Sequence, residues 1–192
     1  MDHQNNREIT LTAAQANVRA LAFMLPILLL YALPYLLLWH GQFTIANLKA
    51  FARTYEANLL YFPFLMFLII GVGAVVHELL HGVTWAVFCK RGFSSISFGI
   101  YWKILTPYCH CKEPLRLKHY LLGGLMPGFI LGLLPAVYGI VLGNFGWWLF
   151  GLFFTFAAAG DLLIVWMLRR QNSNDLVQDH PEKIGCFILE RG

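Results

Sequence analysis

Four long segments of the chain are apolar and almost free of charge, at residues 20–39, 59–89, 120–142 and 147–168. An α-helix rises about 1.5 Å per residue, so about twenty apolar residues cross the roughly 30 Å hydrocarbon core of a bilayer. The segment at 59–89 is longer than one crossing needs and too short for two, so its helix must tilt or project from the membrane. The sequence therefore predicts a mainly α-helical membrane protein with four transmembrane helices.

The composition agrees with this fold class. Hydrophobic residues make up 58% of the 192 residues and charged residues only 12%, which is outside the usual balance of a soluble domain. We expect a single integral membrane domain over residues 1–192, with the lipid bilayer as its main solvent. The net charge of +4 comes from basic residues beside the apolar segments, so we expect no nucleic-acid partner.

The basic residues also predict the orientation, because Lys and Arg gather on the cytoplasmic side of membrane proteins. With four spans and a cytoplasmic N-terminus, the outer segments hold only Lys49 and Arg53. The inner segments then hold the other twelve, namely Arg7, Arg19, Lys90, Arg91, Lys103, Lys112, Arg116, Lys118, Arg169, Arg170, Lys183 and Arg191. Both termini are therefore expected in the cytoplasm.

The segments between the spans carry weaker structural signals. Apolar and polar or small residues alternate along residues 95–104, a period that is typical of a half-buried strand. We therefore expect a small cytoplasmic β-hairpin in the strand region 93–111, between the second and third helices. Residues 40–58 are mixed and fit a loop with a surface helix. The polar cytoplasmic tail, residues 171–192, contains one short apolar run at 185–189 that could form a strand.

One cluster of ionisable residues interrupts the second apolar segment, namely His77, Glu78 and His81 in the sequence HELLH. Positions i and i+4 of a helix lie about 40° apart in projection, so both imidazoles can reach one ion, as in the HExxH motif of zinc hydrolases. Glu78 can then act as the general base, accepting a proton from a water that the metal activates. The motif predicts Zn²⁺ as cofactor and metal-assisted hydrolysis as the reaction.

A catalytic zinc usually has three protein ligands, and Asp161 is the candidate for the third. It is the only acidic residue in the fourth apolar segment, and small residues flank it at 157–160. At helical rise, Asp161 lies about 12 Å from Arg169 and His81 about 13.5 Å from Lys90, so both can lie at one depth. His180 in the tail is the rival third ligand, since a folded tail could return it to the site.

Other interpretations remain open. The HELLH residues could lie in a solvated, inert extension of the second helix, or the two histidines could ligate a haem. Asp161 could pair with a basic residue or cap a broken helix. Cys109, His110 and Cys111 resemble a metal clip, but they lack the second half of a structural zinc site, which favours ordinary strand residues.

Two irregular regions could shape a substrate site. An exposed strand edge beside the metal could hold a peptide extended by β-augmentation, or the sheet could simply plug the helical bundle. The glycines and the proline of residues 123–128 loosen the start of the third span. They could shape a substrate cleft or serve only for packing and a kink.

Four stretches of the sequence resemble one known group of proteins. These are HELLHG at 77–82, TPYCHCKEPL at 106–115, the Gly160-Asp161 pair and DHPEKIG at 179–185. They resemble small bacterial membrane proteins of the "putative zincin peptidase" family, whose function is unassigned. More remotely, HExxH in one membrane helix and an Asp in a later one are similar to the site-2 proteases. That resemblance implies His77, His81 and Asp161 as zinc ligands and Glu78 as the general base.

The sequence thus predicts a zinc-dependent intramembrane endopeptidase that cleaves a membrane-associated peptide or protein near the cytoplasmic face. One alternative is a non-enzymatic membrane protein, for metal binding, transport or interaction, that has kept a relict HExxH motif. Another is a membrane hydrolase with a non-peptide substrate, which would use the same residues.

Overall fold

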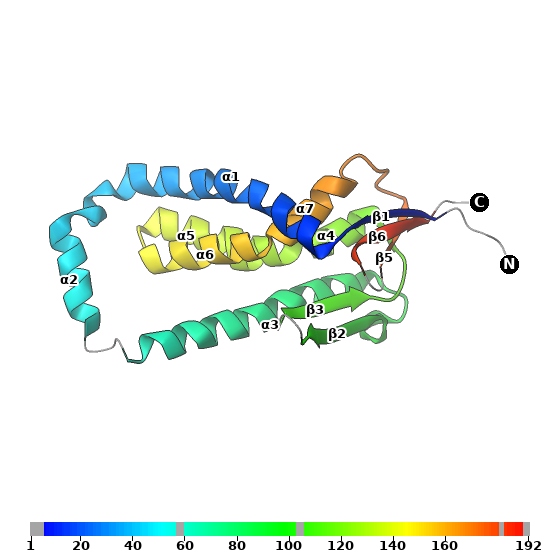
Figure 1. Ribbon diagram of the computed structural model, residues 1–192, viewed down its shortest axis with the longest axis horizontal. Helices are drawn as coiled ribbons and strands as arrows, with labels where there is room; N and C mark the ends of the chain where they lie inside the picture. The colour runs from blue at the N-terminus through cyan, green and yellow to red at the C-terminus, as the bar shows by residue number, and fades with distance from the viewer. Residues whose placement is uncertain (1–5, 57–59, 103–105, 181–182, 190–192) are drawn as a thin grey trace.

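The computed structural model describes residues 6–56, 60–102, 106–180 and 183–189. Its longer helices lie side by side along one axis, and its strands and both ends of the chain gather at one end (Figure 1). Helix α2 (Ile45–Glu56) lies across the opposite end and connects α1 (Ala13–Trp39) to α3 (Phe62–Phe88). The chain therefore has a helical body with a strand-containing end.

The helical body is formed in chain order by seven α-helices and one π-helical segment, η3, in the described residues. They are α1 (Ala13–Trp39), α2 (Ile45–Glu56), α3 (Phe62–Phe88), α4 (Leu117–Pro127), η3 (Gly128–Leu133), α5 (Leu134–Leu142), α6 (Phe145–Ala157) and α7 (Ala159–Leu168). Short 3-10 turns follow α1, as η1 (His40–Phe43), and α3, as η2 (Gly92–Ser95).

Local sequence signals set several helix boundaries. Thr12 and Gln15 form a reciprocal capping box at the start of α1, which satisfies backbone N–H groups that a helix start leaves unpaired. Helix α5 ends at Gly143, whose φ of 65° is left-handed and favours glycine. Asn144 then caps α6 by accepting from the Trp147 N–H. These residues produce the tight connection between the last two apolar segments.

Three helical stretches in the described residues are long and apolar enough to cross a membrane, at Ala14–Phe43, Phe62–Phe88 and Leu117–Leu142. The pair α6 and α7 makes a fourth candidate if it counts as one span. Large apolar side chains are exposed along α1 and α3, including Leu37 and Phe67, as lipid-facing helices require. The prediction of a mainly helical protein is confirmed, with three or four candidate spans.

The fourth segment, expected as one helix over 147–168, is bent by 50° between α6 and α7. The break lies at Ala158, whose backbone leaves the α-helical conformation. It falls among the small residues 157–160. The bend places Asp161 in the first turn of α7, where the helix dipole favours a negative charge.

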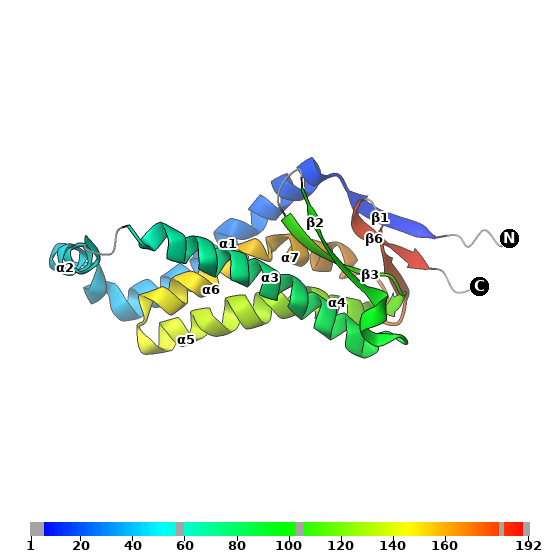
Figure 2. The same ribbon diagram turned by 90° about the horizontal axis from the view of Figure 1, so that it is seen from below.

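The expected hairpin is present as an antiparallel pair of strands, β2 (Ile96–Tyr101) and β3 (Thr106–Cys111). Its register pairs Ile96 with Cys111. The end of the expected alternation falls on residues 103–105, which lie outside the described residues. Figure 2 shows the hairpin near α3, to which β3 is packed.

A second antiparallel sheet has the strand order β1-β6-β5-β4. It joins the N-terminal segment, the start of α4 and the tail through β1 (Arg7–Leu11), β4 (Leu115–Arg116), β5 (Leu176–Asp179) and β6 (Ile184–Leu189). Strand β6 includes the apolar run expected as a strand, whereas the other three were not expected. Buried side chains from α3, α4, α7 and both sheets form one continuous core, which fixes the sheets against the helices.

Candidate metal centre

Helix α3 carries His77 and His81 one turn apart, and α7 brings Asp161 to both of them. Asp161 Oδ2 lies 3.1 Å from His77 Nε2, and Asp161 Oδ1 lies 3.4 Å from His81 Nε2. The candidate ligand atoms of the three residues all lie within 4.8 Å of one another. The histidine side chains are only 11% and 6% exposed, so the cluster is largely shielded from solvent.

The His81 ring is held by its surroundings. Its Nδ1 lies 2.8 Å from the carbonyl oxygen of Gly123, and because a carbonyl only accepts, Nδ1 must carry the proton. Nε2 faces Asp161, and in the neutral imidazole it would be the free nitrogen, which is the arrangement of a zinc-binding histidine supported by a backbone carbonyl.

The indole of Trp85 stacks on the His81 ring, with centroids 5.1 Å apart, and its Nε1 donates to the Tyr120 carbonyl at 3.0 Å. A side chain at position 123 would overlap this indole, so the approach of α4 to α3 requires Gly123. These contacts were not predicted from the sequence, although Trp85 follows His81 by four residues and therefore shares its helical face.

Glu78 lies beside the cluster, in a cavity of about 510 Å³ at the strand-containing end. His81 and Asp161 also line this cavity, together with Tyr108 and Cys109 of β3 and residues of the tail. The backbone N–H of Cys109 faces the Glu78 carboxylate. Among the described residues, no ion pair includes Glu78, so its carboxylate is placed to accept a proton in the cavity. We name this space the tail cavity.

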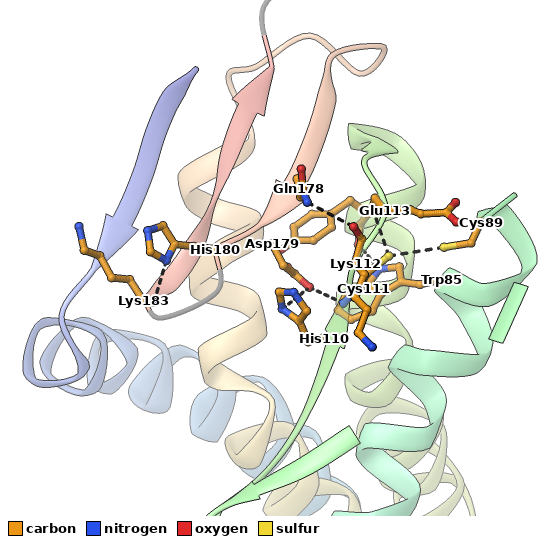
Figure 3. Close-up of polar contacts among 11 residues, drawn as sticks. Trp85, Cys89, His110, Cys111, Lys112, Glu113, Gln178, Asp179, His180 and Lys183 are labelled. Carbon is orange, nitrogen blue, oxygen red and sulfur yellow. Dashed lines mark hydrogen bonds and ion pairs between the residues drawn. The ribbon is translucent and has the colours of Figure 1, made fainter. Parts of the chain in front are cut away.

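Asp179 of β5 holds the tail against the hairpin and α4. Its Oδ1 accepts from the Tyr120 hydroxyl at 2.6 Å, and its Oδ2 accepts from the Cys111 N–H at 2.8 Å. His110 Nδ1 lies 3.6 Å from Oδ2, and Figure 3 shows His110 and Cys111 converging on Asp179. Burial raises the pKa of the Asp179 carboxyl, against the opposing effect of its hydrogen-bond donors. Sequence reasoning missed this cluster because Asp179 lies more than fifty residues along the chain from each of these partners.

His180, the rival third ligand, lines the tail cavity but does not join the His-His-Asp cluster. Its Nε2 lies 3.6 Å from Glu8 Oε1, and its Nδ1 accepts from the Lys183 N–H at 2.9 Å. Figure 3 shows His180 beside Lys183. Both ring nitrogens therefore face partners outside the cluster, one in β1 and one in the tail, and the structure leaves Asp161 as the third candidate ligand.

The cysteines of the hairpin behave as strand residues. Burial raises the pKa of the Cys109 thiol, and it raises that of Cys111 to about 12. The Cys111 thiol donates to the Glu113 carbonyl at 3.3 Å and lies 3.5 Å from the Cys89 sulfur. All four cysteines of the chain are free. Burial thus favours the neutral thiol at Cys109 and Cys111.

The donor set of the cluster fits a catalytic zinc ion. Two imidazole nitrogens and one carboxylate oxygen are the kinds of ligand that zinc binds, and catalytic zinc sites keep three protein ligands and an open position. Here the tail cavity is lined by two of the three residues, His81 and Asp161, so the open coordination position of a zinc ion could face this cavity. His77, His81 and Asp161 could therefore hold zinc with access from the tail cavity.

Tyr120→Phe tests the Asp179 cluster. We expect it to lower the free energy of unfolding by about 1–3 kcal/mol, because a buried carboxyl loses a donor. Tyr138→Phe is the matched control, since Tyr138 is exposed on α5 and should cost much less. Reversible unfolding in mixed micelles measures both.

The effect of Tyr120→Phe should depend on pH. A folded-state pKa of Asp179 above its ordinary 3.8 means that the folded protein binds its proton more tightly than the unfolded chain. Stability from this group therefore falls as pH rises above that value. Removing the Tyr120 donor raises the pKa further, so the loss should be larger at pH 8 than at pH 4. An equal loss at both values would contradict a charged Asp179 as the acceptor.

A comparison of the chain with models of protein families identifies its family. Neither the curated proteins nor the solved structures gave a match, and similarity to the site-2 proteases was not found. The model of the family described as "Putative zincin peptidase" matches residues 69–176, which is more than half of the chain. The match includes HELLH and Asp161 and ends before Asp179. The resemblance expected from the sequence is confirmed: the chain belongs to this "Putative zincin peptidase" family.

Proposed function

We propose that the protein is a zinc-dependent membrane endopeptidase that cleaves a membrane-associated peptide or protein near the cytoplasmic face. The observation that carries this proposal is the convergence of His77, His81 and Asp161, with candidate ligand atoms within 4.8 Å, beside Glu78. Helices α3 and α7, which are far apart in the sequence, bring these residues together. The family description "Putative zincin peptidase" supports peptides as the substrate class.

Each side chain of the cluster has a role in the proposed reaction. A zinc ion held by the three residues would lower the pKa of a coordinated water towards 7 and polarise the carbonyl of the scissile bond. Glu78 accepts the proton of the attacking water and delivers it to the nitrogen of the leaving amine. The Gly123 carbonyl and the Trp85 indole keep His81 in one orientation. The bond that breaks is the C–N bond of the peptide.

The proposed cleavage position follows from the membrane orientation. Four spans, with α6 and α7 as the fourth, would place both termini on one side of the membrane. The strand-containing end carries both termini, whereas α2, with Lys49 and Arg53, lies at the other end (Figure 1). The excess of basic residues outside α2 supports a cytoplasmic position for the strand-containing end. The tail cavity lies at this end, so we place cleavage near the cytoplasmic face.

The wall of the tail cavity supports an extended peptide as substrate. Strand β3 pairs with β2 on one side, and its residues Pro107 to His110 line the cavity. A peptide lying in the cavity would therefore run beside a strand. A helical substrate must unwind and become extended before its peptide bond is hydrolysed, and a neighbouring strand supports the extended form.

Metal removal tests the proposed function. Protein reconstituted in proteoliposomes is incubated in H₂¹⁸O with a mixture of synthetic membrane-spanning peptides, and mass spectrometry identifies the new ends. We expect one ¹⁸O in each new carboxyl group, and cleavage that falls to background after 1,10-phenanthroline and returns with added zinc. The isomer 1,7-phenanthroline, which does not chelate, is the matched control.

The outcomes separate the candidate functions. The proposal would be overturned if the purified protein contains no zinc and if no ¹⁸O-labelled peptide ends form after zinc is added. Bound zinc without labelled ends would instead support the non-enzymatic alternative. Cleavage that resists the chelator would remove zinc from the mechanism.

A further inference from the structure

A second cavity that reaches Asp161 lies among α1, α4, η3, α6 and α7 of the helical body. It has a volume of about 260 Å³, and its walls include Gly124, Leu125, Gly128, Phe129, Leu133 and Ala158. Asp161 lines both this space, which we name the bundle cavity, and the tail cavity. The candidate metal centre therefore lies where a polar cavity and an apolar cavity meet.

The chemistry of the bundle cavity favours an apolar occupant. Apart from Asp161, its polar side chains are Tyr31 and Thr155, whose hydroxyls lie 3.1 Å apart. The Thr155 hydroxyl also donates to the Gly151 carbonyl at 2.8 Å. These two groups therefore satisfy each other and the backbone within the wall. An aliphatic or aromatic group could enter without leaving them unpaired.

Two features of α4 and η3 create the space. A Cβ atom added at Gly124 would meet nothing within 4 Å, whereas one added at Gly128 would approach the Ala158 methyl group at 3.2 Å. The wall continues into the π-helical segment η3, which holds Phe129 and Leu133. Such π-helical segments are rare and frequent at functional sites. The hollow thus depends on a missing side chain at position 124 and on an irregular helix.

We propose that the bundle cavity is a specificity subsite that takes a large aliphatic or aromatic side chain of the substrate, next to the scissile bond. This inference rests on the proposed peptidase function. The peptide would lie in the tail cavity and place one apolar side chain past Asp161 into the helical body. Substrates would then be peptides with such a residue at the membrane boundary, followed by a polar cytoplasmic segment.

Gly124→Leu fills the cavity without a clash at the added Cβ, which makes it the test variant. Gly71→Leu is the matched control, because a Cβ there also meets open space and Gly71 lines none of the described cavities. The probe is a series of membrane-spanning peptides in which one position near the boundary is Ala, Val, Leu, Phe or Lys. Cleavage by each full-length variant in proteoliposomes is followed by mass spectrometry.

We expect the wild type and Gly71→Leu to prefer Leu or Phe at one fixed position beside the cleaved bond. Gly124→Leu should lower the preference for Leu or Phe over Ala by about tenfold or more, as the loss of space in an apolar pocket does. Leu133→Ala, which enlarges the cavity, should shift the preference towards Phe. An unchanged preference in Gly124→Leu, or an equal loss for all peptides with zinc retained, would overturn the subsite.

A binding measurement separates failure of the subsite from failure of the proposed function. Peptide carrying one photo-leucine at the boundary position is irradiated with the Glu78→Gln protein. Crosslinking reports binding and does not require cleavage of the peptide. We expect crosslinks to Phe129 or Leu133 that Gly124→Leu removes and Gly71→Leu keeps. A photoreactive phospholipid acyl chain is tested in parallel. Labelling of these residues by the lipid and not by the peptide would assign the cavity to lipid and overturn the proposal, whatever the activity.

Discussion

Glu78→Gln is expected to lower peptide hydrolysis by about 10²- to 10⁴-fold, the range for loss of a general base. The amide has nearly the same size as the carboxylate, but it cannot accept the proton of the attacking water. Glu78 lies in the tail cavity beside His81 and Asp161 but is not one of the three candidate ligands. The variant should therefore keep about one zinc ion per chain, as a three-ligand site binds.

Two measurements check this expectation, namely metal content by mass spectrometry and the initial rate of ¹⁸O incorporation. Glu113→Gln is the matched control, because Glu113 pairs with Arg91 at 2.8 Å and does not line the tail cavity. It should leave the rate nearly unchanged. Loss of zinc in Glu78→Gln would mean that Glu78 is a ligand, and an unchanged rate would remove it from the proposed mechanism.

The site residues that a short stretch of sequence identifies could be predicted. His77, Glu78 and His81 are close in sequence, and helical spacing alone puts both imidazoles on one face. Asp161 lies eighty residues later in the chain, but an acidic residue in an apolar segment is costly and therefore conspicuous. The comparison of its depth with that of His81 assumed straight helices. The structure brings the two together although α6 and α7 are bent by 50°, because Asp161 follows the bend and lies in α7, which Arg169 caps.

The parts that sequence reasoning missed depend on contacts between distant segments. Strand β1 is five residues long and pairs Arg7 with Ile188, so its partner lies at the other end of the chain and cannot be identified locally. Asp179 looked like an ordinary residue of a polar tail, since only the fold buries it against Tyr120 and Cys111. The role of Gly123 likewise appears only once the Trp85 indole lies against it.

Asp161→Ala is expected to weaken zinc binding by more than about 100-fold, the upper range for loss of a supporting residue beyond the ligands themselves. Hydrolysis should then fall to background at a zinc concentration that saturates the wild type. Asp179→Asn is the matched control, because Asp179 is also a carboxyl near the tail cavity but lies outside the cluster. It should keep its zinc. Equilibrium dialysis against a zinc buffer measures the affinity of each variant.

The same experiment separates a metal ligand from a simple ion pair. The distances of 3.1 Å and 3.4 Å between Asp161 and the two histidines also suit a carboxylate paired with protonated imidazole. An ion pair of that kind needs no metal, so the wild type would bind no zinc and Asp161→Ala would lower only the stability. A zinc site needs unprotonated histidine nitrogens, so affinity in the wild type should fall in acid as protons compete with the metal. Zinc affinity that is equal in the wild type and in Asp161→Ala would exclude Asp161 as the third ligand, even if the protein is a peptidase.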